Sequence, residues 1–285
     1  MNTQVFGVVV TYHPDLENIQ NILESAKQVD RLVVVDNGSG SEIESQLDKV
    51  ALQTTNIDIV KNGDNLGIDV ATNIGIQMYI DKYQFVLTLD QDSILGENMV
   101  DTMLTGFDEV DDRQCVIIGP NIINNGHKES SDQKYQKVDL LIASGMLIQT
   151  NYLKEHGLLD EYFFIGANDT DLSLRVRSQG YSLYQSSEAL LHHSMGYCTT
   201  HRFLGKNVIT ENYSPFRRYF NSRNSTEILV RYITKYPKIS INFWFNHIIK
   251  SNIKIILFES SKYQKLKYGF LGVFDWVFRH DIRRY

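Results

Sequence analysis

Phe85-Val86-Leu87-Thr88-Leu89-Asp90-Gln91-Asp92-Ser93 is a mainly apolar run that ends in two carboxylates one residue apart. The run itself predicts a buried strand. Residues i and i+2 of an extended chain point to the same side, so Asp90 and Asp92 are placed to share one divalent cation. Mg²⁺ and Mn²⁺ prefer oxygen ligands of this kind. The alternative is an ordinary acidic exit from a strand.

Strands and helices alternate on both sides of this run. The segments with the apolar runs of buried strands are Val5–Thr11, Leu32–Val35, Ile57–Lys61 and Phe85–Leu89. Helical spacing of apolar residues falls between them, at 16–29, 43–52 and 68–80. Such alternation is typical of βαβ units and predicts an α/β fold with a mostly parallel sheet. The polar turns that follow the strands are then expected to form a ligand crevice at one sheet edge.

Two absent motifs limit the classes of ligand expected in this crevice. Neither Gly-x-Gly-x-x-Gly nor Gly-x-x-x-x-Gly-Lys follows the first strand, so nothing indicates a dinucleotide or P-loop site. Further along, strands are expected at 116–119, at 140–149 with a break at Ser144-Gly145, and at 181–184, with a long polar loop at 121–136. A helix is expected at 172–178. Asp169 lies near its N-terminus, where the helix dipole favours an ionised carboxylate.

Composition and charge describe a globular protein with two contrasting parts. Of 285 residues, 42% are hydrophobic and 22% charged, which is ordinary for a soluble domain. Residues 1–200 carry 12 Lys and Arg against 29 Asp and Glu, whereas residues 201–285 carry 16 against 5. This split favours different partners for the two parts. A basic tail suits an anionic membrane, a phosphate-bearing substrate or nucleic acid, or it packs on the acidic part.

Signals of other protein classes are weak. The two cysteines, Cys115 and Cys198, have no metal-type spacing and are expected to be free thiols in a reducing compartment. We expect no secretory signal, because Met1-Asn2-Thr3-Gln4 has no basic segment. No apolar window is long enough to predict a transmembrane helix.

The motifs, taken in order, resemble a family 2 glycosyltransferase with the GT-A fold, and within it the bacterial dTDP-L-rhamnose rhamnosyltransferases. The motifs that carry the resemblance are Asp36-Asn37-Gly38-Ser39, Asn65-Leu66-Gly67, Asn73-Ile74-Gly75, Asp90-Gln91-Asp92-Ser93, Ser144-Gly145, Asn168-Asp169-Thr170-Asp171-Leu172 and His193. The rhamnosyltransferase signature is matched by Ser214-Pro215-Phe216-Arg217-Arg218-Tyr219-Phe220-Asn221-Ser222-Arg223-Asn224. The resemblance covers roughly residues 4–235. It implies a GT-A domain at 1–205 and a basic, aromatic-rich helical region at 206–285.

The resemblance implies that the acidic pair, Asp90 and Asp92, binds the leaving group. Asp90 and Asp92 would hold Mg²⁺ or Mn²⁺ against the diphosphate of a nucleotide sugar, because the departing charge needs a cation. His193 resembles the late histidine of the family, which helps to bind metal or diphosphate. A hydrogen-bonded core histidine is the alternative, and His192 is the other candidate. Asp169 would be the base that takes the acceptor proton during inverting transfer, with a plain helix cap as the alternative.

The resemblance also implies a nucleotide-sugar site. Thr11, Tyr12 and Asp36 would bind the nucleoside, with Tyr12 stacking on the base; alternatively, Asp36 stabilises only its own turn. The remaining nucleotide-sugar-binding residues implied are Asn65, Gly67, Asn73, Gln91, Ser144, Arg217 and Arg223. Gly67 is assigned a backbone role, and Asn73 either contacts the ligand or buttresses the wall. Arg218, Tyr219 and Asn224 are further candidates for contact with a diphosphate or a lipid-linked acceptor. The alternative for Arg218 is a position on the surface of a plain helix.

One departure from the family pattern lies beside the expected base. The rhamnosyltransferases favour Ile-Asp-x-Val-Asp-x-Glu-Trp, and other branches carry Gly-x-Glu-Asp-x-Asp-Leu. This chain has Ile165-Gly166-Ala167-Asn168-Asp169-Thr170-Asp171-Leu172, with Asn168 in place of the Glu. Both alignments keep the base at Asp169. The absent carboxylates leave the donor sugar and the acceptor open.

The C-terminal region combines aromatic and aliphatic residues with Lys and Arg. This composition suits helices that lie in a membrane interface, and oligomer packing is the alternative. Together with this composition, the resemblance implies a cytoplasmic enzyme, peripheral to the inner face of the plasma membrane. It would transfer L-rhamnose from dTDP-β-L-rhamnose to a lipid-linked saccharide in cell-surface polysaccharide synthesis. The alternatives are a UDP-galactofuranose, UDP-glucose or UDP-galactose donor and, more remotely, a non-catalytic or nucleic-acid-binding protein.

Overall fold

The structure, a computed structural model, describes residues 5–123, 133–192 and 198–278. The described chain separates into two compact units. The first holds the residues up to Phe164 and those from Asn168 to His192. The second holds Ile165–Ala167 and the residues from Cys198 onward. Cys115 and Cys198 form no disulfide in the part of the chain that the structure describes.

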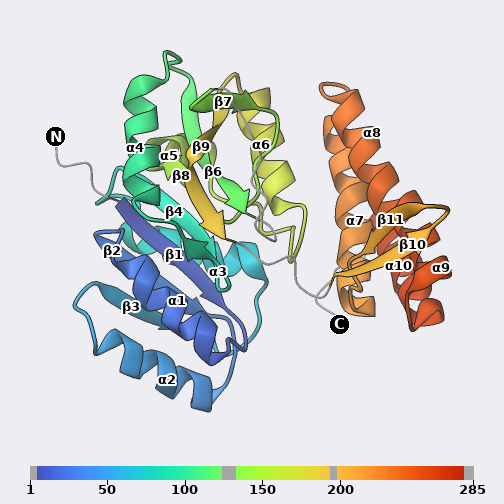
Figure 1. The fold of residues 1–285 in the computed structure, drawn as a ribbon, viewed down its shortest axis with the longest axis horizontal. Coiled ribbons are helices and arrows are strands. Elements are labelled where there is room, and N and C mark those ends of the chain that lie inside the picture. The colour runs from blue at the N-terminus through green and yellow to red at the C-terminus, as the bar shows by residue number, and fades with distance from the viewer. Residues whose placement is uncertain (1–4, 124–132, 193–197, 279–285) are drawn as a thin grey trace. The chain divides into compact units, whose positions relative to one another are not determined.

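The described part of the first unit is built on a nine-stranded sheet (Figure 1). Its strands are β1 (Val5–Thr11), β2 (Arg31–Asp36), β3 (Ile57–Lys61), β4 (Phe85–Asp90), β5 (Ile94–Leu95), β6 (Cys115–Ile123), β7 (Tyr135–Val138), β8 (Met146–Gln149) and β9 (Ser182–His192). The order is β3-β2-β1-β4-β8-β6-β9-β5, and β7 pairs with β9. The first four strands in this order are parallel, as predicted. Because β8 is antiparallel to both β4 and β6, strands β4, β6 and β9 run in one direction.

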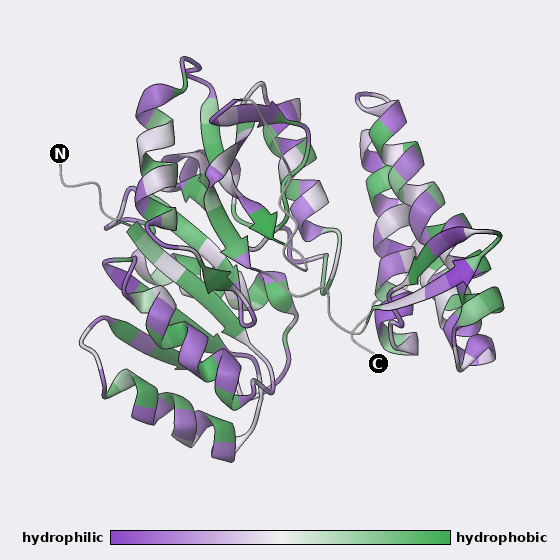
Figure 2. Ribbon diagram, in the orientation of Figure 1, coloured by the Kyte–Doolittle hydropathy of each residue, from purple (hydrophilic) through white to green (hydrophobic). Residues whose placement is uncertain are grey.

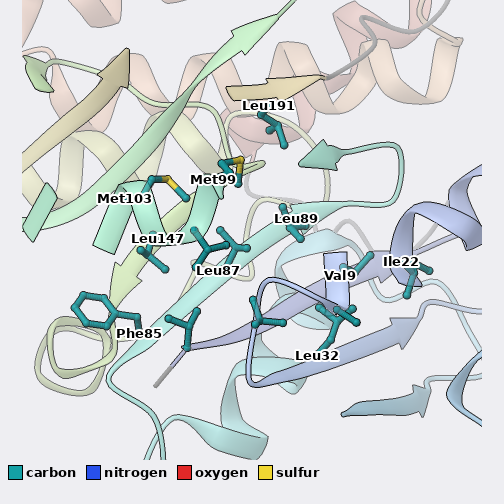
Figure 3. Close-up of a cluster of buried hydrophobic side chains, with 14 of the residues drawn as sticks. Val9, Ile22, Leu32, Phe85, Leu87, Leu89, Met99, Met103, Leu147 and Leu191 are labelled. Carbon is teal, nitrogen blue, oxygen red and sulfur yellow. The ribbon is translucent and has the colours of Figure 1, made fainter. Parts of the chain in front are cut away.

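Helices cover both faces of the sheet. These are α1 (Leu16–Ala26), α2 (Ser41–Ala51), α3 (Ile68–Tyr79), α4 (Met99–Glu109), α5 (Thr150–His156) and α6 (Asn168–Ser178). One hydrophobic cluster joins α1, α2 and α4 to the sheet, and a second joins α3, α5 and α6 to its other face. Figure 3 shows part of the first cluster, in which Leu87 of β4 packs with Met99 and Met103 of α4.

The strands are apolar on both sides because both of their faces are buried. In β4, Phe85, Leu87 and Leu89 enter the first cluster, whereas Val86 enters the second. Figure 2 shows the central strands as mostly hydrophobic and α1 and α2 as banded with polar residues. This period of two in the strands places Asp90 on the face of Val86 and Thr88, toward α3 and α6.

The topology determines where a ligand binds. From β1 the chain moves outward to β2 and β3, and then returns through α3 to β4 on the other side of β1. The strand order therefore reverses between β1 and β4. In open α/β sheets, ligands bind outside the carboxyl ends of the strands at such a point. The polar ends of β1 and β4 meet there.

Several boundaries differ from the sequence expectation. Of the strand expected at 140–149, only the part after the expected break at Ser144-Gly145 forms, as β8 from Met146. At the break, Gly145 has a φ of 84° and its amide donates to the Thr88 carbonyl at 2.7 Å. The strand expected at 181–184 continues to His192, because it pairs along most of β6. The first and last residues of the loop expected at 121–136 belong instead to the strands β6 and β7. Helix α6 begins at Asn168, four residues earlier than expected.

The second unit combines a hairpin with helices. Its elements are β10 (Thr199–Phe203), β11 (Lys206–Thr210), α7 (Pro215–Tyr232), α8 (Pro237–Phe245), a π-helical turn (Asn246–Lys250), α9 (Ser251–Phe258) and α10 (Lys262–Phe278). The hairpin spans position 205, so the unit begins earlier than the expected helical region and is not wholly helical. Helices α7 and α10 lie so close together at Gly272 that a Cβ there would lie 2.2 Å from the Tyr219 carbonyl oxygen. Within the described residues, no helix is long and apolar enough to cross a membrane.

Arg218 is buried in this unit, which corrects the surface position considered from the sequence. Its side chain is 2% exposed. One terminal nitrogen donates to Ser251 Oγ at 2.7 Å, and the other donates to the His247 carbonyl at 3.2 Å. These bonds tie α7 to α9 and to the π-helical turn. Burial lowers the pKa of Arg218.

Candidate functional site

The ends of β1 and β4 are linked across the point where the strand order reverses. The backbone N–H of Tyr12 donates to Gln91 Oε1 at 2.8 Å. The Tyr12 ring is 46% exposed and lies 4.3 Å, between centroids, from the His13 ring. An exposed ring at this edge is free to stack on a planar ligand, whereas Gln91 already holds the strand ends together.

Asp36 is fully buried at the end of β2 and belongs to its own turn. Its carboxylate accepts hydrogen bonds from Thr11 Oγ1 at 3.1 Å, from the Ser39 N–H at 3.0 Å and from Ser39 Oγ. Thr11 is also fully buried. Thr11 and Asp36 therefore support the crevice wall from beneath its surface. Nucleoside binding by Asp36 stays a prediction.

Asn65 and Gly67 form the turn that leads into α3. Asn65 Oδ1 accepts hydrogen bonds from Asn37 Nδ2 and from the Gly67 N–H, both at 3.0 Å. Gly67 has a φ of 89°, and a Cβ there would lie 2.7 Å from a Phe164 ring carbon. Only glycine fits this backbone and this space, so the expected backbone role of Gly67 agrees with its surroundings.

Asn73 buttresses the wall from within α3. It is 2% exposed, its Nδ2 donates to the Leu159 carbonyl at 2.9 Å, and its Oδ1 accepts from the Leu159 N–H at 3.1 Å. This reciprocal pair makes Asn73 a local clamp on the chain before α6. Of the two roles left open by the sequence, these contacts provide the structural one.

The extended geometry expected for the acidic pair ends at Asp90. The Ser93 N–H donates to the Asp90 carbonyl at 3.1 Å, so residues 90–93 form a turn. Strand alternation therefore does not relate Asp92 to Asp90. The turn is fixed by Ser144, whose buried Oγ accepts from the Asp90 N–H at 3.2 Å and pairs with Ser93 Oγ. Ser144 thus acts on the backbone that carries the two carboxylates.

His192, the other candidate histidine, lies close to this turn in the sheet. Strand β5 pairs antiparallel with β9, which places Ile94 opposite His192. Ile94 follows Asp92 by only two residues in the sequence. His192 is exposed at the end of β9. His193, the expected metal ligand, lies outside the described residues. Among the residues that the structure describes, no group of three His, Cys, Asp or Glu side chains is arranged to hold a metal ion.

One pocket brings the expected leaving-group residue and the expected base together. Its lining includes Ile68, Thr72, Thr88, Asp90, Asn168 and Asp169. Asp90 comes from the end of β4, and Asp169 comes from the first turn of α6. The carboxyl edge of the sheet and the N-terminus of a helix therefore converge, although the two residues are 79 positions apart in the sequence.

Asp169 differs electrostatically from the expectation. Its Oδ1 accepts from the Thr170 N–H at 2.7 Å, which stabilises the ionised form. Burial is the larger effect and raises the pKa of Asp169 above its ordinary value. The helix N-terminus therefore does not keep this carboxylate as readily ionised as the sequence suggests. A raised pKa makes the ionised form a stronger base.

The basic motif of α7 makes internal contacts in the second unit. Arg217 lies over the Tyr213 ring, with Cζ 4.6 Å from the centroid. Arg223 is 1% exposed, and its Nε donates to Asn224 Oδ1 at 2.9 Å. Asn224 Nδ2 in turn donates to the carbonyls of Ile165 and Gly166 at 3.0 and 2.8 Å. Asn224 therefore holds the segment that directly precedes Asn168 and Asp169 in the sequence.

Three polar residues at or beside the pocket were given no site role from the sequence. Thr72 and Asn168 line the pocket, and Asp69 is buried behind Asn168. A signal for Asn168 was available in its position beside Asp169. Asp69 gave none, because an acidic residue in the first turn of a helix is ordinarily exposed.

Comparison with known proteins agrees with this arrangement. Residues 8–187 match the model of glycosyl transferase family 2. The dTDP-rhamnosyl transferase RfbF of Shigella flexneri is 26% identical over 249 residues, which cover 80% of this chain and 81% of that protein.

Solved structures share the fold at low identity. A mannosyltransferase from Pyrobaculum calidifontis, in complex with GDP-Man and Mn²⁺, has a TM-score of 0.63 at 11% identity and covers 99% of this chain and 89% of that one. TarS of S. aureus, residues 1–349 in complex with UDP-GlcNAc, has a TM-score of 0.62 at 15% identity and covers 93% and 79%. GalNAc-T7 with UDP, GalNAc and Mn²⁺ has a TM-score of 0.59 at 16% identity and covers 88% and 57%. The chain therefore belongs to glycosyl transferase family 2 and is a glycosyltransferase with a GT-A fold.

Proposed function

We propose that the protein transfers L-rhamnose from dTDP-β-L-rhamnose to a saccharide hydroxyl with inversion. The observation that carries this proposal is the pocket lined by both Asp90 and Asp169. In the reaction, the acceptor oxygen bonds to C1 of the sugar while the bond from C1 to the diphosphate oxygen breaks. Asp169 takes the acceptor proton, and dTDP leaves with the electron pair. The similarity to RfbF supports rhamnose as the sugar.

The leaving diphosphate would be held at the turn after β4. The donor atoms there are carboxylate oxygens of Asp90 and Asp92, which fit Mg²⁺ or Mn²⁺ in preference to softer metals. Mg²⁺ commonly binds through one or two carboxylates together with substrate phosphates, so two acidic residues suffice. The cation would neutralise charge on the leaving group. Two of the solved structures with this fold were determined with Mn²⁺, which supports a divalent ion in general.

The nucleoside would lie over the end of β1. The exposed Tyr12 ring would stack on the base, while the buried Asp36 and Thr11 would support the wall. Gln91 and Ser144 would keep this wall in place through their backbone contacts. Arg217 and Arg223 are proposed to act on the diphosphate or the acceptor.

A donor panel tests the proposed activity. Purified protein with Mn²⁺ should release nucleotide from dTDP-β-L-rhamnose at least ~10-fold faster than from UDP-galactose, UDP-glucose or UDP-galactofuranose, since several lost polar contacts discriminate by this much or more. The measured quantity is the nucleoside diphosphate released. Preference for a UDP-sugar would replace rhamnose by that sugar. Absence of release with every donor would contradict the transferase reaction as proposed.

We further propose that the acceptor is lipid-linked and that the second unit lies against an anionic membrane. Its helices expose large apolar side chains, namely Ile241, Phe245, Ile253, Ile256, Leu257, Phe270, Phe274, Val277 and Phe278. Lys250 and Lys267 are exposed among them, whereas Lys254 is paired with Glu211 at 2.9 Å. Apolar side chains beside cationic ones favour an interfacial position.

Vesicle binding tests this surface. The protein should sediment with phosphatidylglycerol vesicles, and the double variant Lys250→Glu/Lys267→Glu should bind several-fold more weakly, since each basic residue contributes about 1 kcal/mol at an anionic surface. Lys27→Glu, at the exposed residue directly after α1 in the first unit, is the control. If the double variant binds as well as the wild type, or if the wild type self-associates and ignores vesicles, the apolar surface is an oligomer contact.

A further inference from the structure

Asp69 is a buried carboxylate behind the pocket. It lies in the first turn of α3, and only 1% of its surface is exposed. Its Oδ1 accepts a hydrogen bond from Asn168 Nδ2 at 2.9 Å. Its Oδ2 is buried and has no hydrogen-bond partner among the residues that the structure describes.

This arrangement is costly for the fold. A buried polar atom without a partner loses its hydration and gains nothing in return. Burial raises the pKa of Asp69 well above its ordinary value, and the nearby Asp171, Asp160 and Asp169 raise it further. The hydrogen bond from Asn168 opposes this effect. Asp69 is therefore kept at a position where an apolar residue or an amide would stabilise the protein more.

Among the residues that the structure describes, the side-chain hydrogen-bond partner of Asp69 is Asn168. Asn168 lines the same pocket as Asp90 and Asp169. An Asn side chain has a donor end and an acceptor end of nearly the same shape, so packing alone hardly distinguishes the two orientations. A carboxylate oxygen only accepts, so it selects the orientation in which the Asn168 NH₂ faces inward. The carbonyl oxygen of Asn168 is then the polar atom left for a ligand.

We propose that Asp69 is a positioning residue that fixes Asn168 with its amide oxygen presented to the pocket, where a hydroxyl of the bound sugar donates to it. This inference rests on the proposed function, because it names how the same pocket reads the sugar. Ionised Asp69 enforces this orientation, because both of its oxygens only accept. A proton on the unpartnered Oδ2 also keeps it, because Oδ1 then still accepts from Asn168, whereas a proton on Oδ1 would reverse it.

Exchange of the two side chains tests the inference. In Asp69→Asn, residue 69 both donates and accepts, so the orientation of Asn168 is no longer enforced. We expect kcat/KM to fall ~10-fold, mainly through a higher KM for the donor, as for loss of one good hydrogen bond. In Asp69→Asn/Asn168→Asp, the new amide donates to one carboxylate oxygen and the other oxygen faces the pocket. This double variant should recover most of the lost kcat/KM. Asp101→Asn, exposed on α4, is the control.

Thermal unfolding separates positioning from a structural role. Because the pKa of Asp69 is raised in the folded protein, its cost to stability grows as the pH rises above 3.8 and is absent below it. Asp69→Asn should therefore melt at least as high as the wild type at pH 7 and lose this advantage below pH 3.8. Reduced activity in a variant of unimpaired stability supports positioning.

Other results would overturn the inference. Unchanged KM and kcat in Asp69→Asn would show that the orientation of Asn168 does not matter. A fall in melting temperature that accounts for all of the lost activity would make Asp69 structural. These outcomes are read as ratios of variant to wild type on whichever donor the wild type uses. Failure of the proposed rhamnosyl transfer appears separately, as wild-type preference for another donor or for none.

Discussion

Asp169→Asn should reduce transfer by a factor of ~10²–10⁴, the usual contribution of a general base, while nucleotide-sugar binding stays close to that of the wild type. The amide keeps the shape of the side chain and the hydrogen bond from the Thr170 N–H. It cannot take the acceptor proton, so the loss should fall on kcat. Single-turnover transfer and a separate thermal-shift titration with dTDP measure the two effects. Asp81→Asn, at an exposed carboxylate, is the matched control.

The pH dependence of the wild type gives an independent check on Asp169. A base works only when ionised, and burial raises the pKa of Asp169 above 3.8. As the pH falls, kcat/KM should therefore begin to decline at a higher pH than an exposed aspartate would give. This acid limb should be absent from the residual activity of Asp169→Asn. Full transfer by the variant would remove Asp169 as the base, even if the donor site is correct.

The fold could be predicted because its signals are local. Four apolar runs with helices between them suffice for a parallel sheet, and polar residues at strand ends suffice for a crevice at one edge. Asp169 could be placed at a helix start for the same reason, since helix termini have recognisable chemistry. The pairing of Asp169 with Asp90 in one pocket needed the whole topology, because α6 and β4 are far apart in the sequence.

What could not be predicted depends on contacts between distant segments. Asp69 has the sequence context of an exposed first-turn residue, yet it is buried because Asn168 covers it. The turn at Asp90 depends on the buried Ser144, 54 residues away. The proximity of His192 to Asp92 depends on β5, whose two residues carry no periodic signal. Local periodicity contains no information on such contacts.

Removing the carboxylate of Asp92 should abolish the effect of metal on nucleotide binding. We expect Mn²⁺ to increase the thermal stabilisation of the wild type by dTDP, since at equal concentration a more tightly bound ligand stabilises the folded state more. Asp92→Asn should show the same small stabilisation with Mn²⁺ or with EDTA. Transfer should fall by ~10²–10³, as expected when several kcal/mol of leaving-group stabilisation are lost. Glu97→Gln, exposed just after β5, is the local control.

Asp90→Asn distinguishes a shared metal site from a single ligand. If both carboxylates hold the cation, each variant alone should remove the Mn²⁺ effect, and the double variant should be little worse, because residues that act as a unit are not additive. If Asp92 alone binds the ion, Asp90→Asn should keep the Mn²⁺ effect and lose only transfer, since Asp90 also lines the pocket beside Asp169. Full transfer by the wild type in EDTA would contradict both versions. The turn after β4 would then hold the diphosphate through its backbone N–H groups, without a cation.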